Sequence, residues 1–188
     1  MPVTPGVIQP NINNRLCFEA EEYTTITPGV GGDWIDINQS DLDSYGMTGT
    51  LLGGGGIRAH PDEGNQWSSS GDPTAPVVTY TVNLPWSGYV RISIKGMAPD
   101  GAGNSCHVQF NGEWVGNQSV PTNAWSSATF DDVPAGIHTL RIQVREDGAV
   151  IDRIVITPTT LTILQLNSEP LSTRATETPT RRARSFWY

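Results

Sequence analysis

A single carboxylate inside an apolar segment is the first residue of this sequence that could do chemistry. Asp152 lies between Ile151 and Ile154, in a run from 150 to 156 that is apolar on both alternating faces except for Asp152 and Arg153. A carboxylate in such surroundings costs several kcal/mol if it is buried and unpaired. Asp152 therefore needs a cation or a set of hydrogen-bond donors.

Two further carboxylates lie close together near the start of the chain. Glu19 and Glu21 alternate with Phe18 and Ala20, which is the pattern of a strand with one apolar and one acidic face. Two interpretations stay open at this point. The acidic face is either a solvated edge, which is the usual case for such alternation, or part of a cation site.

Signatures of catalysis are scarce in the sequence. The histidines, His60, His107 and His138, stand apart from one another, and neither His-Glu-x-x-His nor Gly-x-Ser-x-Gly occurs. Residues 1–156 contain 17 acids, so no spacing singles out a carboxylate pair for glycoside hydrolysis. We therefore expect a protein that is not an enzyme. Of the two cysteines, Cys17 and Cys106, we expect two unpaired thiols rather than a disulfide.

Charge is distributed unevenly along the chain. Residues 1–156 carry seven Lys and Arg against 17 Asp and Glu, a net charge of −10, whereas residues 157–188 have a net charge of +2. An acidic body argues against nucleic acid as a partner, and Lys95 as the sole lysine argues against an anionic membrane surface. No apolar stretch is long enough to span a bilayer. Met1-Pro2-Val3 does not begin a signal peptide, so we expect any such peptide to be absent from this chain.

The elements that must position the acidic residues are short strands separated by turn signals. The chain of 188 residues has 20 glycines and 14 prolines, and no window shows the apolar spacing of a helix. Alternating segments predict strands within 15–21, 34–37, 57–60, 78–82, 89–95, 105–110, 125–130 and 135–156. The turns at 85–88, 111–112 and 146–148 are predicted to join neighbouring strands directly. We therefore predict an all-β fold, an antiparallel β-sandwich of the jelly-roll type.

Three regions follow from the same patterns. Residues 1–13 are predicted to be an extended leader, residues 14–157 the β-sandwich, and residues 158–188 a Thr/Pro/Arg-rich tail with one further candidate strand at 161–166. The tail is basic and ends in Phe186-Trp187-Tyr188, so we expect it to mediate self-association or docking on an acidic neighbour. The alternative is a linker to another domain.

Several motifs, in this order, resemble the carbohydrate-binding modules of the family 6 and family 35 type. They are Glu19-Ala20-Glu21, Tyr80-x-Val82-x-x-Pro85-x-x-Gly88-Tyr89, Trp125, Ala135-Gly136-x-His138-x-Leu140 and Ile151-Asp152, and they cover Leu16 to Thr157. The resemblance implies a non-catalytic β-sandwich appended to secreted polysaccharide-degrading enzymes. It also implies a polysaccharide or oligosaccharide as ligand and a secreted or extracellular location.

The resemblance further implies a structural calcium ion held by Glu19, Glu21 and Asp152. Carboxylate oxygens are the ligands that Ca²⁺ prefers, so calcium would also neutralise the charge that Asp152 carries into its apolar surroundings. Removal of the ion should then lower the melting temperature. The alternative is that Arg141 or Arg153 neutralises these acids.

The sugar cleft of this family is harder to place on the sequence. An asparagine two residues before the calcium aspartate usually binds the sugar, and Val150 stands there. Replacement contacts are predicted from Glu146, Asp147 and Arg145, with Trp125 as the stacking aromatic. Trp67, Trp34 and Tyr45, all in the glycine-rich loops, are candidates by residue type only. The alternative for Trp125 is a residue of the core.

Two further alternatives accompany this cleft. The outward residues of two strands form a second candidate face, which we expect to be simply solvated: Tyr89, Arg91, Ser93, Lys95, His107 and Gln109. A structural or assembly sandwich without a sugar site is the alternative to a glycan-binding module.

Overall fold

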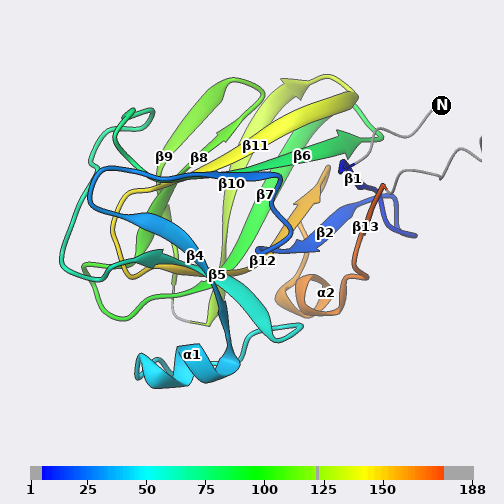
Figure 1. The fold of residues 1–188 in the computed structure, drawn as a ribbon. Helices are drawn as coiled ribbons and strands as arrows, with labels where there is room; N and C mark the ends of the chain where they lie inside the picture. Colours follow the sequence, from blue (N-terminus) through cyan, green and yellow to red (C-terminus); the bar gives the residue numbers. More distant parts are fainter. Residues whose placement is uncertain (1–5, 122, 176–188) are drawn as a thin grey trace, which may run out of the picture.

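The computed structural model describes residues 6–121 and 123–175, which fold into two packed β-sheets (Figure 1). The first sheet has β3 (Thr25–Thr27) paired to β6 and the order β13 (Thr173–Arg174), β1 (Ile8–Gln9), β6 (Val77–Leu84), β11 (Gly136–Val144), β8 (Ser105–Phe110), β9 (Glu113–Ser119). The second sheet has β2 (Leu16–Glu19) paired to β12 and the order β10 (Ala124–Val133), β7 (Gly88–Met97), β12 (Val150–Thr157), β5 (Gly55–His60), β4 (Asp33–Asn38). The pair β1 and β6 is parallel, and the other strand pairs described are antiparallel. The predicted all-β sandwich is confirmed.

Aromatic side chains join the inner faces of the two sheets. The rings of Phe18 on β2 and Tyr80 on β6 lie 5.2 Å apart, and those of Phe110 on β8 and Phe130 on β10 lie 5.7 Å apart. Each pair brings one residue from each sheet into the same buried cluster. Aromatic pairs at this separation stabilise a core beyond the area that they bury.

The turn at Asn111-Gly112 is a hairpin, as predicted, and two other predicted hairpins are wrong. Asn111 and Gly112 have φ angles of 50° and 85° and join β8 to β9, which pair with each other. The segments 85–87 and 145–149 instead cross between the sheets, because β6 and β11 belong to the first sheet and β7 and β12 to the second. Strand β12 is apolar on both faces because it lies inside its sheet, between β7 on one side and β2 and β5 on the other.

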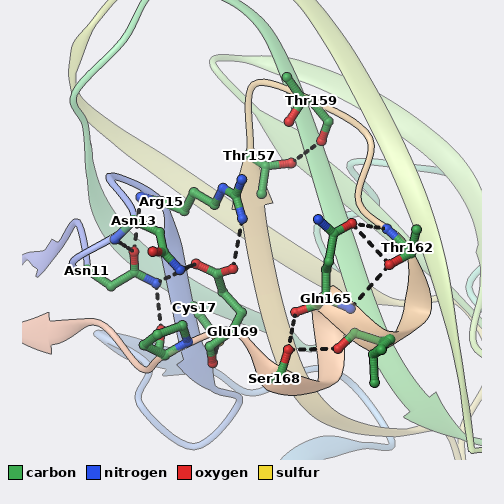
Figure 2. A network of polar contacts seen from close by, with 12 residues as sticks. Asn11, Asn13, Arg15, Cys17, Thr157, Thr159, Thr162, Gln165, Ser168 and Glu169 are labelled. Atoms are coloured by element: carbon green, nitrogen blue, oxygen red, sulfur yellow. Dashed lines mark hydrogen bonds and ion pairs between the residues drawn. The ribbon is translucent and has the colours of Figure 1, made fainter.

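The two ends of the described chain are part of the sandwich rather than a separate leader and tail. Strand β1 pairs with β13, and the buried Glu169 carboxylate accepts hydrogen bonds from Asn11, Asn13 and Arg15 at 2.9 to 3.0 Å (Figure 2). The predicted docking segment Phe186-Trp187-Tyr188 lies outside the described residues.

Two short helices accompany the sheets, α1 (Gln39–Ser44) and α2 (Ile163–Ser168). The strand expected at 161–166 is therefore wrong. Thr162 and Gln165 form a capping box that starts α2, and Leu166 packs on Cys17 and Val155. No helix among the described residues is long and apolar enough to cross a membrane. Both cysteines, Cys17 and Cys106, are buried and unpaired as expected.

Truncation of Phe110 to alanine should destabilise the fold. The ring is fully buried between the sheets, so Phe110→Ala leaves a cavity and should reduce the free energy of unfolding by about 3 to 5 kcal/mol. Urea unfolding measures this loss. Ile137→Thr is the matched control, because Ile137 is exposed on β11 and its replacement should change stability by less than about 0.5 kcal/mol. Equal losses in both variants would contradict the assignment of the core.

Candidate functional site

The Asp152 carboxylate is fully buried and is bound by an ammonium group and a backbone amide. Lys95 Nζ donates to Asp152 Oδ2 at 2.6 Å, and the Leu52 amide donates to Oδ1 at 2.9 Å and to Oδ2 at 3.1 Å. The same ammonium donates to the Thr50 carbonyl at 3.0 Å. Lys95 was predicted on a solvated face, but it is 5% exposed, because the 50–52 segment covers it. Burial raises the pKa of Asp152, and the Lys95 ammonium opposes this shift.

The two glutamates differ in their surroundings. Glu19 forms a buried ion pair with Arg153, whose Nε lies 3.2 Å from Glu19 Oε2. Glu21 Oε2 is buried and has no hydrogen-bond partner among the described residues. Burial raises the pKa of both carboxyls, and Arg153 counteracts the shift at Glu19. Arg153 thus neutralises the charge of Glu19, whereas the described structure gives Glu21 no such ion pair.

The predicted calcium ligands lie near one another but do not form an open metal site. Among the described residues, no group of three or more His, Cys, Asp or Glu side chains is arranged to hold a metal ion. Lys95 forms an ion pair with Asp152, and Arg153 forms one with Glu19. The alternative that an arginine neutralises the acids therefore holds for Arg153 and Glu19. Arg141 instead lies over the Trp114 ring. The three acids therefore do not fit a calcium site in this arrangement, and calcium binding stays a prediction.

The four-glycine run 53–56 closes over these acids. A Cβ on Gly53 would lie 2.6 Å from Glu19 Oε1, and one on Gly55 would collide with Glu21 Oε1. Gly53 also has a φ of 78°, which favours glycine. Gly53 and Gly55 thus leave room for the backbone to pass directly over the carboxylates of Glu19 and Glu21.

The cleft expected around Val150 is filled by side chains. Val150 is fully buried in a second apolar cluster with Met97, Leu42 of α1, Met47 and Leu51. Figure 1 shows α1 at one end of the sandwich, next to β4 and β5. A valine suits this position because it packs against the segment that closes the cleft.

Most of the predicted sugar-binding residues have structural partners. Glu146 is buried and accepts from the Ser105 hydroxyl at 2.6 Å and from the Asn104 amide at 3.1 Å. Arg145 forms an ion pair with Glu146. Asp147 is buried and accepts from the backbone amides of residues 63, 64 and 65 at 2.8 to 3.2 Å. These polar groups hold loops in the folded chain, and their contact with a sugar stays a prediction.

The predicted aromatic residues are divided between core and surface. Trp34 and Trp67 are 2% and 7% exposed and belong to the main core, so neither forms a platform. Tyr45 is 38% exposed and lies under the Arg58 guanidinium, 3.9 Å from its carbon to the ring centroid. Arg58 in turn pairs with Asp62 at 3.0 Å.

Trp125 borders one of the hollows on the surface of the described residues. The ring is half-buried on β10, and its Nε1 donates to Asn167 Oδ1 of α2 at 2.8 Å. A cavity of about 320 Å³ opens beside it, which we call the Trp125 pocket. Its lining consists of Thr50, Leu52, Lys95, Asn123, Ala124, Trp125, Ile163 and Asn167.

A second hollow was not expected from the sequence. The Trp114 groove, about 290 Å³, lies on the outer face of the first sheet and includes Asp72, Arg141 and Gln143. Trp114 lies on β9, directly after the Asn111-Gly112 turn. This place beside a predicted hairpin turn was the sequence signal that could have identified it as a surface aromatic residue. The second candidate face was predicted to be one surface, and this is wrong because its residues belong to different sheets. β7 of the second sheet carries Tyr89, Arg91, Ser93 and Lys95, whereas β8 of the first sheet carries His107 and Gln109.

Replacement of Asp147 should loosen a loop without affecting a ligand. Asp147→Asn replaces one of the two carboxylate oxygens that accept from the backbone amides of residues 63, 64 and 65 by an NH₂ group and removes the charge, so it should lower the free energy of unfolding by about 2 to 3 kcal/mol. Amide hydrogen exchange at residues 63–65 should become faster. Asp62→Asn, at a half-exposed site in the same loop, is the control. Loss of glycan affinity at unchanged stability would instead make Asp147 a ligand contact.

Stability should fall on mild acidification because of His107. Its Nε2 lies 3.0 Å from the Trp67 carbonyl oxygen and its Nδ1 accepts the Asn117 amide, so the neutral ring fits the site. Burial holds the pKa of His107 below the ordinary value of 6.5. The unfolded chain therefore binds the proton more readily, and stability is lost as the pH falls below 6.5. Urea unfolding between pH 7.5 and 5.5 should show this slope, and His107→Gln should reduce it; an equal slope in both would contradict the assignment.

Comparison with known proteins shows the fold. No protein-family model matches the chain, and no curated protein sequence is detectably similar to it. The C-terminal CBM6 of LamC, a marine laminarinase from Zobellia galactanivorans, is 20% identical with a TM-score of 0.50, covering 76% of this chain and 98% of that one. A family 35 carbohydrate-binding module from Clostridium thermocellum is 15% identical with a TM-score of 0.52, covering 77% and 98%. The chain therefore has the β-sandwich fold of family 6 and family 35 carbohydrate-binding modules.

Proposed function

We propose that this chain is a non-catalytic glycan-binding module whose sugar site is the Trp125 pocket. The main observation in support is the half-buried indole of Trp125 beside a cavity of about 320 Å³, whose lining also includes Asn123 and Asn167. The cavity lies on a sandwich with the fold of carbohydrate-binding modules. A volume near 300 Å³ is at the lower end of ligand sites and suits a short stretch of a sugar chain.

The residues of the pocket match the chemistry of a pyranose ring. One face of such a ring is apolar and can pack on the indole of Trp125, while its hydroxyls both donate and accept hydrogen bonds. Asn123 and Asn167 supply amide groups at the rim, and Thr50 contributes a further polar group. The bond from Trp125 Nε1 to Asn167 holds the indole in a fixed orientation, which reduces the entropy lost on binding.

The same pocket supports binding rather than catalysis. Hydrolysis of a glycosidic bond by the usual mechanism needs two carboxyl groups beside the sugar. None of the described residues that line the pocket is acidic, and Lys95 is already bound to Asp152 and Thr50. The proposed role is to bring a secreted or cell-surface protein to a polysaccharide.

One observation favours the alternative of an assembly subunit. Ile163 and Leu164 on α2 are 66% and 77% exposed, and exposed apolar side chains of this size are found at contacts between proteins. Such a contact would lie at the edge of the Trp125 pocket, because Ile163 also lines it. Self-association through this region and the basic tail is the second candidate function.

Removal of the Trp125 ring should strongly weaken glycan binding. Trp125→Ala should weaken affinity by about 30-fold or more, because a central aromatic contact contributes about 2 kcal/mol or more. Affinity electrophoresis against plant, algal and microbial polysaccharides, followed by calorimetry on the best ligand, measures this loss. Asn167→Ala should weaken binding less, since it removes a rim contact and the bond that orients Trp125.

Trp114→Ala is the matched control for this experiment. It removes an indole from the Trp114 groove and should leave affinity unchanged, and thermal melting must show that each variant is folded. Loss of binding in Trp114→Ala alone would place the sugar in the Trp114 groove. Failure of the unmodified chain to bind any polysaccharide, with a dimer seen by light scattering, would favour the assembly function.

A further inference from the structure

The ammonium group of Lys95 occupies the position of a cation among oxygen ligands. It lies 2.6 Å from a carboxylate oxygen of Asp152 and 3.0 Å from the backbone carbonyl of Thr50. Carboxylates and backbone carbonyls are the ligand types that calcium takes in proteins. We propose that Lys95, assisted by Arg153, serves as the built-in structural cation of this sandwich, so that the folded chain does not depend on a metal ion.

The charge balance of the cluster supports this assignment. Asp152 pairs with Lys95 and Glu19 pairs with Arg153, and all four side chains are buried. Two of the three acids that resemble calcium ligands are thus neutralised by the chain itself, which leaves Glu21 alone. A buried charge is stable where it is both paired and hydrogen-bonded, and Asp152 has the Leu52 amide in addition to the ammonium.

A divalent ion would have to compete with these groups for the same oxygens. Both Asp152 oxygens already accept hydrogen bonds from N–H groups, and the Glu19 carboxylate accepts hydrogen bonds from two nitrogens of Arg153. Displacement of the ammonium would leave a buried lysine without its carboxylate partner. Such a loss of a partner is strongly destabilising.

The built-in cation also joins the acidic cluster to the surface. Thr50, which accepts from Lys95, and Leu52, which donates to Asp152, both line the Trp125 pocket. The 50–52 segment continues into the glycine run that covers Glu19 and Glu21. One interaction therefore holds the loop that forms a wall of the pocket. The inference itself does not depend on what the pocket binds.

The unmodified chain provides the first test. Its melting temperature in excess EDTA should equal that in millimolar CaCl₂, and calorimetry should detect no calcium binding to the metal-free protein. A lower melting temperature in EDTA, or one calcium ion bound per chain, would overturn the proposal. This test does not involve glycan, so its failure is distinguishable from failure of the proposed function.

A double-mutant cycle tests the role of Lys95. Lys95→Met removes the ammonium and keeps the aliphatic stem, and Asp152→Asn removes the carboxylate charge. Each single variant should melt roughly 10 °C lower, because it leaves one buried polar partner unmatched. The double variant Lys95→Met/Asp152→Asn should lose clearly less than the sum of the two, whereas additive losses would overturn the pairing. If Lys95→Met does not fold, chelation of the unmodified chain still decides the proposal.

Discussion

The rest of the structure depends on the neutralisation of one buried carboxylate. Asp152 lies within a central strand of the second sheet, where water cannot solvate its charge. Lys95 reaches it from the neighbouring strand β7, and the Leu52 amide reaches it from a loop. The loop must therefore pass close to the acids, and Gly53 and Gly55 leave room for the carboxylates of Glu19 and Glu21. A single electrostatic requirement thus positions a strand, a loop and one wall of the Trp125 pocket.

The same sandwich offers a ligand a different surface from the one that its resemblance implies. Val150 stands where a sugar-binding asparagine was expected, and it packs with Leu42, Met47 and Leu51 in a sealed apolar cluster. The carboxylates of Glu146 and Asp147 are used to hold neighbouring loops. The open aromatic surface lies instead at the Trp125 pocket and the Trp114 groove, on the outer faces of the two sheets. The fold alone therefore does not decide where a ligand binds, because a binding site consists of particular residues placed on the fold.

Both ends of the described chain contribute to the structure around the Trp125 pocket. Glu169 joins the segment after α2 to Asn11, Asn13 and Arg15, and Leu166 packs on the outer face of the second sheet. These contacts fix α2 beside β10, so that Asn167 can hold the indole of Trp125. Without them, the pocket would lack the wall that α2 provides. The segment that seemed separate from the domain in sequence is therefore part of the candidate site.

The sequence by itself determined most of the longer strands, the all-β class, the Asn111-Gly112 hairpin and the need of Asp152 for a partner. Each of these follows from local alternation, turn chemistry or the cost of a buried charge. The sequence did not reveal β1, β3, β9 or β13. Only the tertiary structure decided which strands share a sheet, since alternation looks the same in a hairpin and in a crossing between sheets. It also decided that Lys95 is buried, that α2 is a helix packed on Cys17 and Val155, and that Trp67 is core while Trp125 borders a cavity. Burial and pairing of this kind depend on residues far apart in the chain, such as Lys95 and Asp152, so no local pattern could reveal them.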